Sequence, residues 1–223
     1  MTTGGGAPQL PGTGRVEAFS DGVFAIAVTL LVLDLKTPAH EPGELLSGLV
    51  RQWPAYAGYL ASFLAVAVIW LNHHQAFVGI RRVDWGVHLA NLALLCTTAL
   101  LPFPTAVISQ AFIDGVDTPD ARTAVALYAG IATAMCVSWL LLYDQVHRRS
   151  NCLMEDGDDP AAFGASRKRA LIGIVAYLGG GLIGVLWAPL AALVVFVVMP
   201  VFYGLTLSRA GSRWRVVKGE SRP

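Results

Sequence analysis

Residues 15–34 read RVEAFSDGVFAIAVTLLVLD, and they are the most informative part of the sequence. Between Asp21 and Asp34 the only polar side chain is that of Thr29. A helix needs about 20 mostly apolar residues to cross about 30 Å of hydrocarbon. The stretch therefore predicts a membrane-spanning helix at residues 18–35.

Five further apolar segments have a similar length, at residues 54–71, 85–108, 121–143, 170–187 and 190–207. The chain of 223 residues is 55% hydrophobic and 14% charged, whereas soluble domains carry about 25% charged residues. The segments do not alternate in polarity, which argues against the strands of a membrane β-barrel. We therefore predict an all-α integral membrane protein with six transmembrane helices.

The basic residues predict the orientation of these helices. With six spans both termini lie on one side, and only three of the 16 Lys and Arg residues, Lys36, Arg51 and Arg122, fall on the other. Because basic residues collect on the cytosolic side, we expect cytosolic N and C termini in a multi-pass protein of the plasma membrane.

The spans also divide the chain into three parts. We expect a disordered, Gly-rich and Pro-rich tail at residues 1–14 and a six-helix membrane domain at residues 15–208. A basic cytosolic tail is expected at residues 209–223.

The polar start of the first span allows two interpretations. Ser20 or Asp21 suits the N-cap of a helix that begins there. Alternatively the helix begins earlier, near Arg15, because no helix breaker intervenes, and it then carries Asp21 into the membrane edge. A carboxylate buried there needs hydrogen-bond donors. The candidate donors lie at or near the ends of the first three spans: Arg15, Asn72, His73, His74 and Asn91.

The first span has two different faces. At 100° per residue, Ile26, Leu30 and Leu33 fall within about 60° of one another. Asp21 lies about 140° from Ile26. One face is thus a column of branched apolar side chains, and another offers a carboxylate to neighbouring helices.

Few residues suggest metal or catalytic chemistry. Cys96, Cys136 and Cys152 have no metal-ligand spacing and are interpreted as unpaired thiols. His73 and His74 project about 100° apart, so we expect structural hydrogen bonds rather than a shared metal, with pH sensing as an alternative.

No motif for a catalytic triad, HExxH or phosphate loop is present, so we expect no enzyme activity and no cofactor. No basic run predicts a nucleic-acid partner.

Several short motifs match one family. The pattern Arg-x-x-x-Phe-Ser-Asp, formed by Arg15, Phe19, Ser20 and Asp21, resembles the signature of the potassium channels related to the lysosomal potassium channel of animals. Bacterial members of that family are short six-span chains. Three further stretches are similar to the family's second and third spans: WLNHHQAF at 70–77, NLALL at 91–95 and LPFPT at 101–105. The later spans match in length and polarity alone.

The resemblance implies a potassium channel that is a homotetramer in the lipid bilayer, with the first helix of each subunit lining a central pore. It implies that Ile26 forms the narrowest ring, that Leu30 and Leu33 form adjoining rings, and that Thr29 offers a hydroxyl nearby. The implied structural residues hold the first helix against its neighbours: Arg15, Phe19, Ser20 and Asp21, supported by Trp70, His73, His74 and Asn91.

An apolar ring can gate by dewetting and favours the ion that sheds water most readily. Potassium loses its hydration more easily than sodium, so potassium is the expected permeant ion. At the outer mouth, a ring of Asp34 carboxylates would concentrate cations. The alternatives are a proton-permeable channel and a proton-coupled secondary transporter with Asp21 as proton carrier. The lack of broken-helix repeats argues weakly against a transporter.

Overall fold

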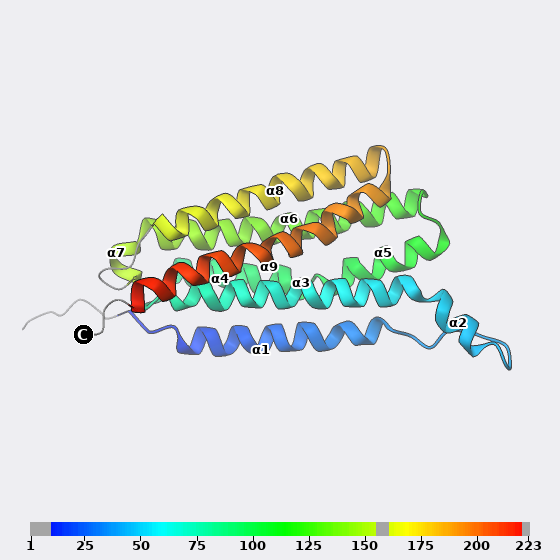
Figure 1. Ribbon diagram of the computed structural model, residues 1–223, viewed down its shortest axis with the longest axis horizontal. Coiled ribbons are helices and arrows are strands. Elements are labelled where there is room, and N and C mark those ends of the chain that lie inside the picture. Colours follow the sequence, from blue (N-terminus) through cyan, green and yellow to red (C-terminus); the bar gives the residue numbers. More distant parts are fainter. Residues whose placement is uncertain (1–9, 155–160, 220–223) are drawn as a thin grey trace, which may run out of the picture.

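Long helices run side by side along one axis in the computed structural model of the chain, which describes residues 10–154 and 161–219 (Figure 1). The first helix, α1 (Gly14–Leu30), continues into the 3₁₀ turn η1 (Leu31–Asp34). The other long helices are α3 (Trp53–Val78), α4 (Trp85–Ala99), α5 (Pro102–Asp114), α6 (Pro119–Arg148), α8 (Ala161–Leu186) and α9 (Pro189–Gly219), and the short ones are α2 (Leu45–Arg51) and α7 (Ser150–Leu153).

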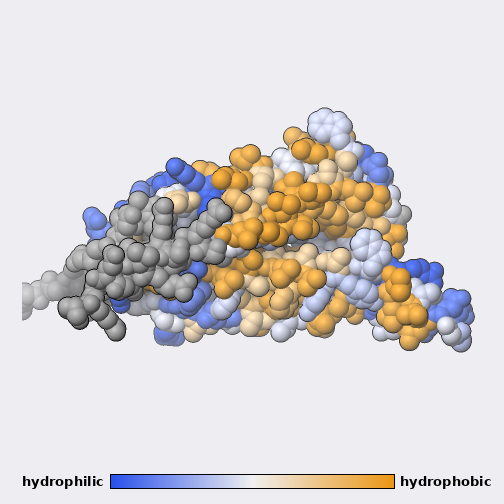
Figure 2. Space-filling view, in the orientation of Figure 1, coloured by the Kyte–Doolittle hydropathy of each residue, from blue (hydrophilic) through white to orange (hydrophobic). Residues whose placement is uncertain are grey.

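Six stretches of the described residues are long and apolar enough to cross a bilayer, which confirms the predicted number of spans. They are Gly14–Asp34, Ala55–Val78, Trp85–Ile113, Pro119–Arg148, Gly164–Leu186 and Pro189–Thr206. Hydrophobic side chains cover the middle of the face seen in Figure 2, and hydrophilic ones gather at its ends. This surface suits a protein whose solvent is lipid.

The start of α1 decides between the two interpretations of its polar residues. The helix begins at Gly14, so Ser20 and Asp21 lie within it and cap nothing. Residues 1–9 of the expected tail lie outside the described part of the chain. The carbonyl of Pro11 accepts a hydrogen bond from the Val83 N–H at 2.9 Å, which connects the segment before α1 to the segment before α4. At the other end α9 extends through most of the expected basic tail, and residues 220–223 are not described.

The third predicted span is two helices, α4 and α5, rather than one. Pro102 and Pro104 cause the break, because neither has an N–H to donate to the carbonyl four residues earlier. These carbonyls belong to Thr98 and Leu100, and each instead accepts a bond from the N–H three residues ahead, at 3.1 Å. The chain thereby crosses the bundle with a bend and without losing these backbone bonds.

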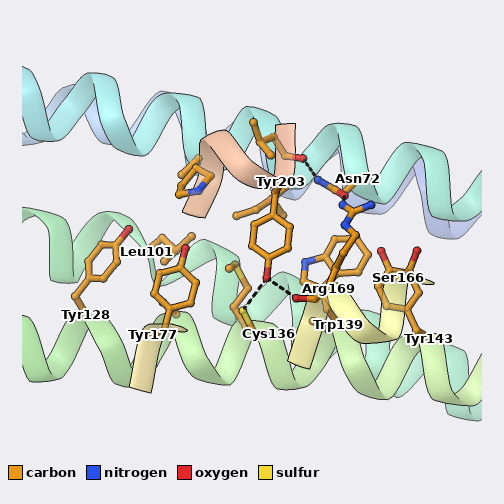
Figure 3. A pocket seen from close by; sticks show the side chains of 17 residues that line it. Asn72, Leu101, Tyr128, Cys136, Trp139, Tyr143, Ser166, Arg169, Tyr177 and Tyr203 are labelled. Atoms are coloured by element: carbon orange, nitrogen blue, oxygen red, sulfur yellow. Dashed lines mark hydrogen bonds between the residues drawn. The ribbon is translucent and has the colours of Figure 1, made fainter. Parts of the chain in front are cut away.

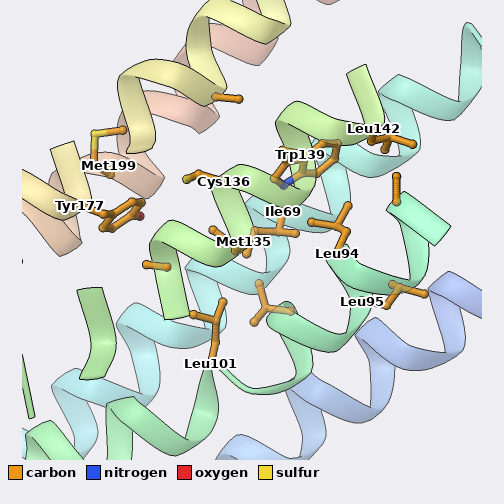
Figure 4. Packing of buried hydrophobic residues seen from close by; sticks show 14 of the residues in the cluster. Ile69, Leu94, Leu95, Leu101, Met135, Cys136, Trp139, Leu142, Tyr177 and Met199 are labelled. Carbon is orange, nitrogen blue, oxygen red and sulfur yellow. The ribbon is translucent and has the colours of Figure 1, made fainter. Parts of the chain in front are cut away.

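Helix α6 lies at the centre of the packing. It contacts α4, α5, α8 and α9, whereas α1 lies at the edge of the bundle and packs mainly against α3 and α4. Figure 4 shows Trp139 and Leu142 of α6 near Ile69 of α3 and Leu94 of α4. Close packing with α8 depends on glycine, because a Cβ at Gly184 would lie 2.6 Å from a methyl group of α6.

A buried carboxylate connects the start of α4 to the end of α6. Asp84 is only 7% exposed and accepts the N–H of Val87 at 2.8 Å, which caps α4. Its other oxygen accepts from Gln145 at 3.2 Å and from Arg149 at 3.1 Å. The carboxylate thus caps α4 and accepts hydrogen bonds from two side chains at the end of α6.

Replacing this carboxylate should destabilise the bundle. Asp84→Ala removes a cap and leaves Gln145 and Arg149 without their acceptor, so we expect the free energy of unfolding to fall by about 2 kcal/mol. Thermal unfolding of the detergent-solubilised protein measures the change. Glu41→Ala, which removes an exposed loop carboxylate, is the matched control and should have little effect. Equal shifts in the two variants would contradict the role of Asp84.

Candidate functional site

Helix α1 buries one face and leaves the opposite one open. Its buried residues are Val16, Ser20, Phe24 and Ala27, and Leu31 of η1 continues the same side. These positions recur every three or four residues, which places them on one stripe of the helix. The stripe meets α3 and α4 and fixes which residues of α1 point away from the bundle.

The column predicted to line a pore lies on the open side of α1. Ile26 is 61% exposed, Leu30 47% and Leu33 68%. Thr29 is exposed beside them, and its hydroxyl donates to the Ile26 carbonyl at 2.9 Å. Asp34 is exposed at the end of η1. All five side chains are therefore available to a second copy of the chain, to lipid or to water.

A chain of hydrogen bonds attaches the buried face of α1 to two other helices. The Ser20 hydroxyl, which is fully buried, donates to the Val16 carbonyl at 2.8 Å. It accepts from the side-chain amide of Asn91 in α4 at 3.0 Å. The Asn91 amide oxygen lies 2.9 Å from Nε2 of His73 in α3. We call Ser20, Asn91 and His73 the anchoring site.

The direction of these hydrogen bonds shows which ring nitrogen of His73 carries a hydrogen. Because the Asn91 nitrogen donates to Ser20, its oxygen is the acceptor, and Nε2 of His73 must carry the hydrogen. The ring is 1% exposed and stacks on Phe77 with centroids 4.4 Å apart. The edges of Phe24, at 5.2 Å, and Trp139, at 6.5 Å, complete its surroundings. His73 is a packed hydrogen-bond donor in this arrangement.

Asp21 has a different partner from those the sequence suggested. Its carboxylate is exposed on the chain and accepts from the indole N–H of Trp70 at 2.9 Å. The expected donor Asn91 binds Ser20 instead, and His74 stacks on the Trp70 ring with centroids 6.0 Å apart. Within one chain Asp21 is therefore exposed rather than buried, because the helix turns Ser20 inward and Asp21 toward the edge of α3.

The family model for the endosomal/lysosomal potassium channel TMEM175 matches residues 15–102, which contain α1, the anchoring site and the break before α5. A potassium channel from Streptomyces collinus is 41% identical over 166 residues, covering 74% of this chain and 79% of that protein. The chain belongs to the TMEM175 family. Since members of this family are channels, it is not an enzyme.

Solved structures of TMEM175 proteins agree with the fold. The crystal structure of a lysosomal potassium-selective channel TMEM175 homolog from Chamaesiphon minutus has a TM-score of 0.74 and 33% identity, covering 87% of this chain and 97% of that one. A variant of the potassium channel MtTMEM175, in complex with a nanobody fusion protein, has a TM-score of 0.61 at 20% identity and supports the fold alone. The bovine endosomal/lysosomal proton channel TMEM175 is 38% identical over 97 residues, only 20% of its length.

The four residues of the TMEM175-like motif do not act alike within one chain. Ser20 and Asp21 contact α4 and α3 as described above. Arg15 is exposed, and Phe19 is 57% exposed on the side of Ile26. The predicted role of holding α1 against its neighbours thus applies within the chain to Ser20 and Asp21, and leaves Arg15 and Phe19 open to other contacts.

Other candidate chemistry has little support in the part of the chain that the structure describes. No group of three His, Cys, Asp or Glu side chains there could hold a metal ion. The three cysteines are free thiols. Arg169 directly precedes the predicted fifth span, and in the structure it belongs to the helix that forms this span, α8, which begins earlier than residue 170. In the sequence, Arg169 could have been recognised as a candidate functional residue because it is a charged residue at the edge of an apolar segment.

Loss of the central amide should loosen the anchoring site. Asn91→Ala leaves the buried His73 N–H without an acceptor and Ser20 without a donor, so we expect a loss of about 1–3 kcal/mol in the free energy of unfolding. Thermal unfolding in detergent measures it. Leu92→Ala, on the exposed side of the same helix, is the control. A destabilisation by Leu92→Ala as large as that by Asn91→Ala would refute the assignment.

Proposed function

We propose that this chain is a subunit of a potassium-selective cation channel, a homotetramer in which four copies of α1 surround the pore. The observation that carries the proposal is the open face of α1, where Ile26, Leu30 and Leu33 point away from their own subunit. The TMEM175 relatives that are named potassium channels support the choice of ion.

A lipid-facing α1 would also expose apolar side chains, so the support for a pore rather than lipid comes from the polar residues of this helix. Asp21, Thr29 and Asp34 are all exposed on the chain. Charged and polar side chains in contact with hydrocarbon are costly and normally face other helices or a water-filled space. A position against neighbouring subunits around an aqueous pore satisfies both the apolar column and these polar groups.

In this arrangement the apolar ring itself selects the ion. The sequence has no TVGYG loop, so backbone carbonyls of that kind do not replace the hydration shell. A ring of Ile26 side chains instead narrows the pore and holds a dewetting barrier, with Leu30 and Leu33 forming further rings. Potassium crosses such a ring more easily than sodium because it loses water at a lower energetic cost.

We place the N and C termini in the cytosol and the channel in the plasma membrane. The start of α1 and the end of α9 lie at the same end of the bundle (Figure 1). Most Lys and Arg residues belong to this end and to the loops beside it, which supports the orientation. Asp34 then lies at the outer mouth of the pore, at the end of η1.

Widening and wetting the ring should reduce selectivity. Ile26→Asn places an amide at the proposed constriction, so we expect the ratio of potassium to sodium permeability to fall several-fold. Ion flux into liposomes containing the purified protein measures this ratio. Val32→Asn, which alters an exposed branched residue outside the column, is the control and should leave the ratio unchanged. Unchanged sodium exclusion in Ile26→Asn would refute the constriction.

The proposed role of Asp34 predicts a salt-dependent effect. Asp34→Asn removes the ring of charge at the mouth, so single-channel conductance should fall at low salt. At about 1 M salt the Debye length is only about 3 Å, and the difference from wild type should disappear. Asp120→Asn, at an exposed position before the fourth span, controls for general surface charge. Equal conductance of Asp34→Asn and wild type at low salt would exclude Asp34 from the mouth.

A proton-permeable channel or proton-coupled transporter is the second candidate. Two observations favour it: Asp21 is exposed and accepts a hydrogen bond from Trp70, and the animal relatives are named proton channels. The same liposome assay separates the candidates. A potassium channel carries current down the potassium gradient alone, whereas an obligatory exchanger moves potassium only when protons move in return.

A further inference from the structure

The charged side chain of Arg169 lies near the start of α8, the helix of the fifth candidate span, and points toward other helices. Its Nη2 donates to the amide oxygen of Asn72 in α3. The guanidinium carbon lies 5.7 Å from the centre of the Tyr203 ring in α9. The Tyr203 hydroxyl in turn donates to the Arg169 carbonyl at 3.1 Å. These contacts position the guanidinium between α3, α8 and α9, and they supply dipoles rather than a negative charge.

Two basic residues near Arg169 form ion pairs and Arg169 does not. Arg148 and Arg167 share the carboxylate of Asp144, at 2.6 and 3.0 Å. Among the described residues, no Asp or Glu forms an ion pair with Arg169. Its Nε is buried and has no hydrogen-bond partner. A positive charge with a free donor in a membrane protein requires an anion or water to satisfy it.

Arg169 and Tyr203 line a small cavity, shown in Figure 3. Its volume is about 40 Å³, which is enough for about three water-sized groups, fewer than the four oxygens of one phosphate. Three of its residues, Val68, Tyr128 and Pro200, also line a second hollow of about 400 Å³ between α3, α5 and α9. The second hollow is lined mostly by apolar side chains.

The second hollow is long enough to hold an acyl chain. Along α9 its lining extends from Leu193 to Leu205 and along α3 from Trp53 to Val68, rises of about 18 and about 22 Å, so it crosses more than half of the hydrocarbon thickness of about 30 Å. Arg169 stands about 25 Å from Leu186 at the far end of α8, which places it near the boundary of the hydrocarbon at the end of the bundle that contains the termini. The charge of Arg169 and the apolar groove therefore follow one another along the bundle in the same order as the head group and the acyl chain of a lipid.

We propose that the Arg169 cavity and the adjoining groove bind one anionic phospholipid from the leaflet at this end. The phosphate accepts hydrogen bonds from the guanidinium, including the free Nε–H, and one acyl chain lies in the groove between α3 and α9. Arginine suits phosphate because its planar group donates two parallel bonds. The exposed side chains of Leu64, Val197 and Val201 leave the groove open for entry from the bilayer. The site does not depend on the proposed channel function.

Native mass spectrometry of the full chain in detergent tests the site, with phosphatidylglycerol and phosphatidylcholine of matched acyl chains as probes. Wild type should bind phosphatidylglycerol more tightly. Arg169→Gln should weaken phosphatidylglycerol about tenfold, the effect of losing a charge-assisted bond, and leave phosphatidylcholine unchanged. Arg167→Gln removes the same charge from the same helix outside the cavity and should change binding less than twofold.

A second variant tests the groove without touching the charge. A Cβ at Gly204 would meet the Val68 side chain at 3.4 Å, an ordinary contact. Gly204→Leu is therefore expected to fold while filling the groove, and it should also weaken phosphatidylglycerol. If Arg169→Gln does not fold, this variant and the preference of wild type for phosphatidylglycerol decide the question.

Three results would overturn the proposal. The first is equal binding of the two lipids by wild type. The second is a loss of phosphatidylglycerol binding in Arg167→Gln as large as that in Arg169→Gln, which would indicate general surface charge. The third is a changed number of subunits in Gly204→Leu with unchanged lipid binding, which would show that a second copy of the chain occupies the groove.

Discussion

The hydrogen bond from Asn91 to Ser20 sets the rotation of α1, and the exposed surface of that helix follows from it. Within hydrocarbon no water replaces a lost partner, so a buried hydroxyl and a buried amide restrict how two helices can pack. With Ser20 turned toward α4, the 3.6-residue repeat turns Ile26, Leu30 and Leu33 outward. A single polar contact thus determines which side chains meet other subunits, lipid or water.

Helix α3 connects two polar sites through adjacent residues. Asn72 contacts Arg169 of α8, whereas His73 contacts Asn91 of α4. Neighbouring side chains on a helix project about 100° apart, so one turn of α3 serves the anchoring site on one side and the Arg169 cavity on the other. A shift of α3 caused at either site would reach the other directly, because both depend on the position of the same turn.

Much of the fold follows from local sequence. Each span is recognised by the hydropathy summed over about 20 residues, and that sum does not depend on the contacts of the helix. The sequence left two possible starting points for α1. The absence of a helix breaker before Asp21 indicated the earlier start. The break between α4 and α5 was also readable, since Pro102 and Pro104 remove donors in any context. It was missed because a hydropathy sum does not register a missing N–H.

Six membrane spans follow from the sequence alone, and the first three of them carry the motifs of the TMEM175 family. The folded structure was needed to show that Trp70 rather than His74 donates to Asp21, that Phe19 is exposed, and that Arg169 faces the bundle interior. These contacts join residues that are far apart in the chain. Ser20 and Asn91 lie 71 residues apart, and Asp21 and Trp70 lie 49 apart. Whether such groups meet depends on the rotation and depth of whole helices, which packing sets and no local pattern encodes.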